Sequence, residues 1–201
     1  MTQQAAQEER RPVNHGPRSA ARNRAALVAA AREIYAEHGL DAPLSAIARR
    51  AGVGQGSLYR HFPDRAAVVA VVLEENVRQI EQAATAEDAG FEDVLGVLTW
   101  HLTESAAFIA FLRADEASVR PDVRAHALAL AGRVERALLR HLPGGRPPDA
   151  RRPAAADDVM LAVAMVSGAA TGPTRQERER RALKAWRLLG VEVGPVRPFE
   201  E

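Results

Sequence analysis

Residues 44–65, LSAIARRAGVGQGSLYRHFPDR, decide the fold of this chain, because they predict two short helices joined by a tight turn. In the first of these helices the apolar positions share one face, with Arg49 and Arg50 outside, and Gly52 ends the helix. The apolar positions are Leu44, Ile47, Ala48 and Ala51. Val53, just beyond the turn, is expected to pack beneath both helices. The segment therefore predicts a helix-turn-helix, a motif whose second helix enters the major groove of DNA.

The second helix of the motif, over residues 55–61, is expected to pack against the core with one side and to face the DNA with the other. At 100° per residue, Leu58 and Phe62 point inward. The opposite side, which is free to enter a major groove, carries Gly56, Ser57 and Arg60. The edges of that side carry Tyr59 and His61, whose polar tips are placed to reach phosphates on the two groove walls.

The outer side of this helix offers side chains suited to reading bases. Arg60 is the best choice for paired hydrogen bonds to a guanine, and Gln55, on the leading turn, suits an adenine. Ser57 can bind a base edge or a phosphate, and Gly56 allows the helix backbone to approach the DNA closely. These residues are the predicted base-contacting set.

A long fourth helix follows the motif. Pro63 closes the reading helix, and Asp64 is expected to cap a helix that starts at Arg65 and continues to about Ala84. The positive end of that helix, together with Arg65, predicts a contact with a backbone phosphate. Because of its length, the helix is expected to connect two domains.

The residues before the motif predict one helix over residues 21–38, with an apolar face and Gly39 in the left-handed position that ends it. Residues 1–20 lack apolar periodicity, which predicts a disordered basic arm. This arm is either a solvated tail or a flexible basic segment that lies along the minor groove or backbone of the DNA. Its arginines, with one from the start of the helix, are Arg10, Arg11, Arg18 and Arg22.

Composition favours an all-α protein, because Ala and Leu are abundant and β-branched runs are few. The net charge of +1 is unevenly distributed: residues 1–65 carry ten Arg against six acids, whereas the remainder carries seventeen basic and twenty acidic residues. The absence of cysteine excludes a disulfide framework and a thiolate metal site. No apolar run approaches the roughly 20 residues that span a bilayer, and the first residues lack the apolar core of a signal peptide. We therefore expect a cytoplasmic protein without membrane contact.

The pattern IARRAGVGQGSLYRHFPDR, preceded by AAREIYAEHGLDAPL, resembles the TetR family of transcriptional regulators from about Arg24 to Leu73. This resemblance implies a three-helix DNA-binding domain followed by an all-helical domain that binds an effector and dimerises. It places Gln55, Gly56, Ser57 and Arg60 toward the bases, and Tyr59, His61 and Arg65 on phosphates. Two positions depart from the family pattern: Gly54 stands where many members have a capping Ser or Thr, and Arg65 replaces the more frequent Lys.

We accordingly divide the chain into a basic arm (1–20), a helix-turn-helix domain (21–66), and an effector-binding and dimerisation domain (67–201). Helices are expected over residues 91–105, 106–116, 121–142, 156–170 and 176–189, with a Pro- and Gly-rich connection over 143–153. The aromatic residues of this half, with two polar neighbours, are the predicted lining of a ligand pocket. They are Trp100, His101, Glu104, Phe108 and Phe111. Alternatively the aromatic residues are ordinary core, and His101 and Glu104 make a simple hydrogen bond instead of holding a metal or a polar ligand.

The resemblance implies a four-helix dimer contact, which the last two helices could form, because small residues on one face permit close helix packing. The predicted interface consists of Met160, Val163, Ala164, Ser167, Gly168, Leu183, Trp186 and Leu189. Packing within one chain would use the same residues equally well. Dimerisation is favoured because one reading helix covers a half-site, whereas a symmetric pair reads a palindrome.

The sequence contains no pattern of a catalytic site: no phosphate loop after a strand, no nucleophile elbow and no set of metal ligands. We expect no enzyme activity, no cofactor and no metal, and as partners an operator DNA, a second copy and an unknown small molecule. A ligand-released repressor is the favoured function. The alternatives are a regulator controlled by a protein partner or by no effector, and a protein that binds DNA without sequence preference.

Overall fold

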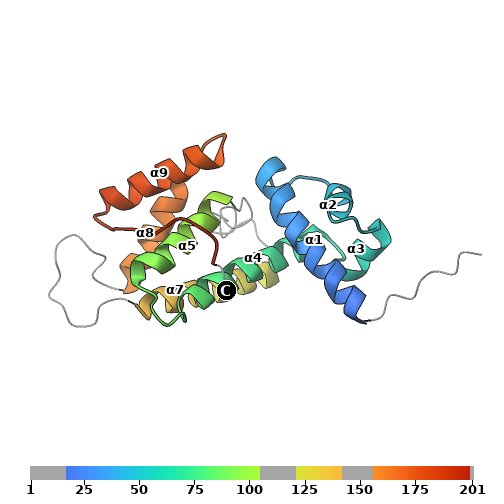
Figure 1. Cartoon of the computed structure of the whole chain (residues 1–201), viewed down its shortest axis with the longest axis horizontal. Helices are drawn as coiled ribbons and strands as arrows, with labels where there is room; N and C mark the ends of the chain where they lie inside the picture. Colours follow the sequence, from blue (N-terminus) through green and yellow to red (C-terminus); the bar gives the residue numbers. More distant parts are fainter. Residues whose placement is uncertain (1–16, 105–120, 142–155, 200–201) are drawn as a thin grey trace, which may run out of the picture.

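The computed structural model describes residues 17–104, 121–141 and 156–199, and every regular element in these ranges is an α-helix. The helices are α1 (Pro17–His38), α2 (Leu44–Arg50), α3 (Gln55–His61), α4 (Arg65–Ala83), α5 (Phe91–Glu104), α7 (Pro121–Leu139), α8 (Ala156–Ala169) and α9 (Arg175–Leu188). Figure 1 shows α1 to α3 at one end and α5, α7, α8 and α9 at the other, with α4 running between them. The all-α prediction is confirmed. Within the same ranges, no helix is long and apolar enough to cross a membrane.

Helix boundaries agree with the sequence prediction to within one residue except at two ends. Helix α1 begins at Pro17, four residues before the predicted start, so the last part of the expected arm is helical. Proline suits a first helical turn because its missing N–H has no partner there in any case. Helix α7 ends at Leu139, whereas the prediction ran to residue 142. The rest of the arm, the predicted helix over 106–116 and the connection over 143–153 lie outside the described residues.

The first three helices enclose a small core that fixes the direction of α3. Leu27, Ile34 and Tyr35 of α1 are buried together with Ile47 of α2 and Leu58 of α3. The chain reverses direction after α1 and after α2 at Gly39 (φ +74°) and Gly52 (φ +66°), where a residue with a side chain would be strained. Val53 packs against this core, as predicted.

The start of α4 is anchored to the helix-turn-helix domain. The Asp64 carboxylate accepts a hydrogen bond of 2.8 Å from the Ala67 N–H, which confirms the predicted cap. Arg65 Nη1 donates to the carbonyl oxygens of Leu40 and Ala42 in the turn between α1 and α2. Any rotation of the first turn of α4 therefore carries the DNA-binding domain with it.

At its other end, α4 is held to α7 by Arg133. The Arg133 guanidinium donates from Nε and Nη2 to the two carboxylate oxygens of Glu81, at 2.8 and 2.7 Å, and from Nη1 to Glu74. The bond from Arg133 is the main reason that the pKa of Glu81 lies below its usual value. Both ends of α4 are thus bound to different domains.

Helix α5 forms the centre of the larger domain, with Leu95, Leu98 and Leu102 fully buried. Trp186 of α9 donates from Nε1 to Thr99 Oγ1 at 2.9 Å, and Arg178 of α9 donates from Nε to the Thr103 carbonyl oxygen at 2.7 Å. The C-terminal segment after α9 crosses α5 nearer its N-terminus, where the Gly194 N–H donates to the Glu92 carbonyl oxygen at 2.9 Å. Helix α9 and the C-terminal segment therefore cover successive turns of α5.

Candidate nucleic-acid interface and pocket

The reading helix α3 has the two sides that the periodicity predicts. Its inner residues Leu58 and Phe62 are 1% and 2% exposed. The outer residues are exposed or half-buried: Gln55, Gly56, Tyr59 and Arg60 are exposed, and Ser57 and His61 are half-buried. The buried pair fixes the orientation of the helix, so the outer residues face solvent together.

Arg60 lies folded along its own helix. Its Nε donates to the Gly56 carbonyl oxygen at 3.1 Å, and its Nη2 donates to Ser57 Oγ at 3.0 Å. Both contacts are local and exposed, so each adds little to stability. They hold the guanidinium within the predicted base-contacting set, and Arg60 must exchange them to bind a base.

The N-terminus of α3 has no side-chain cap. Gly54 occupies the N-cap with φ −63° and ψ 143°, and only its carbonyl oxygen participates, accepting from the Ser57 and Leu58 N–H groups. A Ser or Thr at this position would add a hydroxyl acceptor for one of the free N–H groups of the first turn. As expected, Gly54 in place of the usual Ser or Thr leaves the N-terminus of α3 without a side-chain cap.

Arg65 is placed differently from the sequence prediction. Its guanidinium is part-buried and bound to the two carbonyl oxygens of the α1–α2 turn, so in this structure it faces the domain interior. A phosphate contact at this point is then left to the N–H groups at the start of α4. Sequence periodicity could not show this arrangement, because it depends on a turn more than twenty residues away.

The sequence prediction missed Arg24, an exposed residue of α1. Its guanidinium carbon lies 5.5 Å from the centre of the Phe62 ring, directly after the reading helix. Helical periodicity places Arg24 on the same side of α1 as Leu27. It does not show that the C-terminal end of α3 lies beside Arg24. Arg24 therefore adds positive charge at the C-terminal end of α3.

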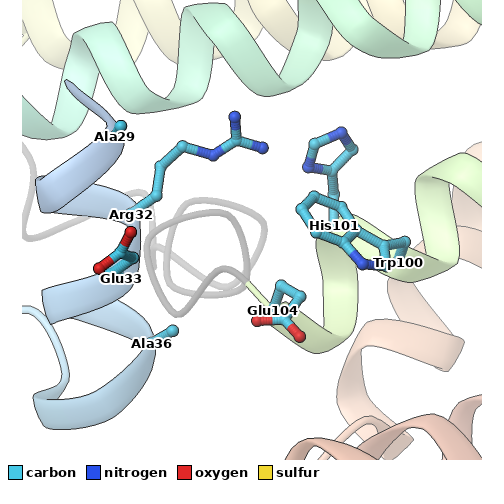
Figure 2. Close-up of a pocket in the computed structure, with 7 residues that line it drawn as sticks. All are labelled: Ala29, Arg32, Glu33, Ala36, Trp100, His101 and Glu104. Carbon is cyan, nitrogen blue, oxygen red and sulfur yellow. The ribbon is translucent and has the colours of Figure 1, made fainter. Parts of the chain in front are cut away.

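Three of the predicted pocket residues lie together. Trp100, His101 and Glu104 of α5 line a pocket of about 260 Å³, and the facing wall comes from α1. That wall consists of Ala29, Arg32, Glu33 and Ala36. Figure 2 shows the Arg32 side chain reaching from α1 across the space toward His101 and Trp100. The other two predicted residues, Phe108 and Phe111, lie outside the described residues.

The sequence prediction also missed Arg32, although a signal was present. Arg32 stands between Ala29 and Ala36, each one helical turn away, so one long charged residue interrupts a stripe of small ones. Its guanidinium carbon lies 5.5 Å from the centre of the Trp100 ring. The side chain is half-buried, and this burial lowers the pKa of Arg32.

His101 is fully buried beside the pocket, with its ring at the edge of Trp100 and the ring centres 4.8 Å apart. Burial, and secondarily the positive charge of Arg32, lower the pKa of His101 to about 3. The imidazole is therefore neutral at physiological pH. Among the described residues, no three or more His, Cys, Asp or Glu side chains are grouped to hold a metal ion.

The acids around the pocket are bound to arginines. Glu33 accepts from Arg50 Nη1 of α2 at 2.7 Å, and Glu104 forms an ion pair with Arg175 of α9. In contrast, Arg32 has neither a hydrogen bond nor an ion pair among the residues that the structure describes. Among the described residues, Arg32 therefore has no acid bound to it directly, although the charges of Glu75 and Glu104 act on it.

The predicted dimer surface needs correction at three residues. Val163, Ser167 and Trp186 are 1%, 1% and 2% exposed and lie in the interior of their own chain. Met160, Leu183 and Leu189 are half-buried, and Ala164 and Gly168 are exposed. The prediction missed other large apolar residues that are exposed on these helices: Leu161 and Met165 on α8, and Leu188 on α9. Helix α8 is apolar on almost every side, so the spacing of its apolar residues does not show which face is buried.

The fold and the exposed reading helix define a helix-turn-helix DNA-binding regulator. Residues 27–72 match the sequence profile of the bacterial regulatory proteins of the tetR family. A comparison with curated proteins finds no match. The DNA-binding segment is similar to that of the tetR family, and the chain has the fold of TetR family transcriptional regulators.

Solved structures of TetR regulators share this fold over most of their length. A TetR transcriptional regulator from Streptomyces coelicolor is 26% identical, with a TM-score of 0.53, covering 83% of this chain and 95% of the other. The regulatory protein TetR from Rhodobacter sphaeroides is 19% identical, with a TM-score of 0.58 and coverages of 84% and 97%. LfrR from Mycobacterium smegmatis, solved in complex with proflavine, is 18% identical, with a TM-score of 0.52 and coverages of 88% and 99%.

Proposed function

We propose that this protein is a ligand-released transcriptional repressor that binds a palindromic operator as a homodimer. The observation that carries the proposal is α3, whose polar outer side faces solvent while Leu58 and Phe62 hold its inner side in the core. Gln55, Gly56, Ser57 and Arg60 would contact bases, and Tyr59 and His61 would contact phosphates. Arg65, as placed here, would act mainly by orienting α4.

Arg60→Ala should weaken binding to the operator by about 1 to 3 kcal/mol, or roughly 5- to 150-fold, because a paired contact with guanine is lost. The operator is first obtained by selecting bound fragments from genomic DNA of the source organism. Affinity is then measured on this operator and on a scrambled duplex at one salt concentration. Arg140→Ala, which removes one exposed charge far from α3, is the matched control. Equal losses on both duplexes would reduce Arg60 to a phosphate contact.

A homodimer is supported by an exposed apolar face on α8. Leu161 and Met165 are 59% and 53% exposed, and Ala164 and Gly168 on the same side of the helix are small enough for a partner helix to approach closely. On α9, Leu188 is 79% exposed beside charged residues. A face of this kind on a regulator that reads half-sites favours association with a second copy. We propose that α8 and α9 pack against the same helices of the partner.

Met165→Arg should convert the dimer to a monomer at micromolar concentration, because it places two charges in the centre of the proposed interface. The change costs the single chain little, since Met165 is half-exposed. Sedimentation velocity measures the result, and circular dichroism checks the fold. Leu128→Arg adds the same charge at another exposed apolar position, on α7, and should leave the oligomeric state unchanged. A Met165→Arg protein that remains dimeric would place the interface elsewhere.

Release by a small molecule is supported by the pocket, whose two walls belong to α1 and α5. The relative LfrR was solved with proflavine, so one protein of this fold holds a flat organic molecule. A ligand that binds better to one arrangement of the two domains would shift the protein away from its DNA-binding state. The competing possibility is a regulator that answers to a protein partner or to no effector, and it predicts that no small molecule releases operator DNA.

A further inference from the structure

We propose that the pocket between α1 and α5 is the effector site, and that it takes a small organic acid with a flat apolar body. Its carboxylate would bind Arg32 and its ring would lie against Trp100. This inference rests on the proposed ligand-released repression, and it adds the chemical class of the ligand and the place where it acts.

The charges around the pocket select an anion. Three acids lie near Arg32, and each already has a cation of its own: Glu33 has Arg50, Glu75 has Arg78 at 2.7 Å, and Glu104 has Arg175. A cationic ligand would have to break one of these pairs. An anionic ligand needs only Arg32, which is half-buried and, among the described residues, has no acid bound to it directly. Because a guanidinium can bind both oxygens of a carboxylate, this group completes the site best.

The size and lining of the pocket select a small flat body. Its volume of about 260 Å³ lies just below the range of about 300 to 1,000 Å³ that holds drug-sized ligands, so one or two rings fill it. Trp100 provides an aromatic face, and Ala29 and Ala36 leave room on the opposite wall. Buried His101 is neutral and adds no competing charge.

The position of the pocket links the ligand directly to the DNA-binding domain. Arg32 and Glu33 are neighbours on α1, and Glu33 is bound to Arg50 at the end of α2, the helix that precedes the reading helix. On the other wall, Glu104 is bound to Arg175 on α9, a helix of the proposed dimer face. A ligand that draws Arg32 toward α5 therefore acts on α1 and α2, in addition to any movement of α4.

The test uses the full chain and three aromatic monocarboxylates, benzoate, 1-naphthoate and indole-3-acetate, each beside its uncharged amide. Titration calorimetry measures affinity. At least one acid should bind at least about tenfold more tightly than its amide, and Arg32→Gln should weaken that acid at least about tenfold. Arg32→Lys keeps the positive charge but loses the forked guanidinium. Its affinity for the acid should therefore lie between those of the unchanged protein and Arg32→Gln. Arg140→Gln, which removes a charge outside the pocket, should bind as the unchanged protein does.

Two results would overturn the acid site: no saturable binding of any of the three acids at millimolar concentration, or equal affinity of acid and amide in the unchanged protein and in Arg32→Gln. Operator release measured in parallel separates this proposal from the broader one. Release by an uncharged or cationic compound, without binding of any acid, would overturn the acid site and leave ligand-released repression intact. Binding of an acid through Arg32 that leaves operator affinity unchanged would support the acid site and count against release from it.

Discussion

Replacing Gly96 by alanine is expected to destabilise the protein by about 3 kcal/mol, the upper end of the usual range for overpacking, and to lift the C-terminal segment away from α5. A Cβ at position 96 would overlap the carbonyl oxygen of Pro195 and would lie 3.2 Å from the Gly194 carbonyl carbon. Both obstacles are backbone, so no side-chain rotation relieves them. The segment must move, and Val191 and Phe199 then lose part of their packing.

Two measurements check this expectation. Urea unfolding gives the change in the free energy of unfolding, and hydrogen exchange of the Gly194 amide reports whether its bond to Glu92 persists. Gly132→Ala in α7 is the matched control, because the new methyl meets only the end of the Arg136 side chain at 3.4 Å. That variant should be stabilised by about 0.5 to 1 kcal/mol, since alanine is the better helix former. If Gly96→Ala also stabilised the protein, the close approach of the tail to α5 would be wrong.

Acidification should destabilise the protein through His101 well before its carboxylates titrate. Burial lowers the pKa of His101 in the folded chain to about 3, whereas the unfolded chain has the ordinary value near 6.5. Between these two pH values His101 binds a proton in the unfolded state but not in the folded state. The free energy of unfolding therefore falls as the pH falls. The slope approaches about 1.4 kcal/mol per pH unit, which gives a loss of about 2 kcal/mol between pH 7 and 5.

Urea unfolding at a series of pH values from 7 to 5 measures this loss. In His101→Leu, which cannot titrate at that position, the pH dependence over this interval should be smaller by about the same 2 kcal/mol. His126→Gln, which removes an exposed histidine, is the matched control. An unaltered slope in His101→Leu would mean that His101 takes up protons in the folded state.

The helix-turn-helix domain could be predicted closely because its sequence signals are local. Gly39, Gly52 and Asp64 mark helix ends through the backbone conformation or the cap that each residue type favours, and the structure confirms all three. The inward direction of Leu58 and Phe62 follows from helical geometry alone. Here residues close together in the sequence determine the structure.

The larger domain was less predictable because its contacts join distant residues. Trp186 was expected on a dimer surface, but it bonds to Thr99, eighty-seven residues earlier, inside the chain. Arg32 was not predicted as a pocket residue for the same reason, because α1 and α5 lie opposite each other only in the folded chain. A helix that is apolar all round, such as α8, does not reveal which face a partner covers.

The folded-back position of Arg60 has a consequence for how the protein would search DNA. Its guanidinium already has two acceptors within α3, the Gly56 carbonyl oxygen and the Ser57 hydroxyl. On random sequence nothing draws Arg60 out, so the protein would slide on phosphate contacts alone and leave quickly. If Arg60 binds a guanine as proposed, the side chain would exchange two internal bonds for two bonds to the base. Recognition would then slow dissociation more than it speeds association, and the operator would be distinguished by how long the protein stays.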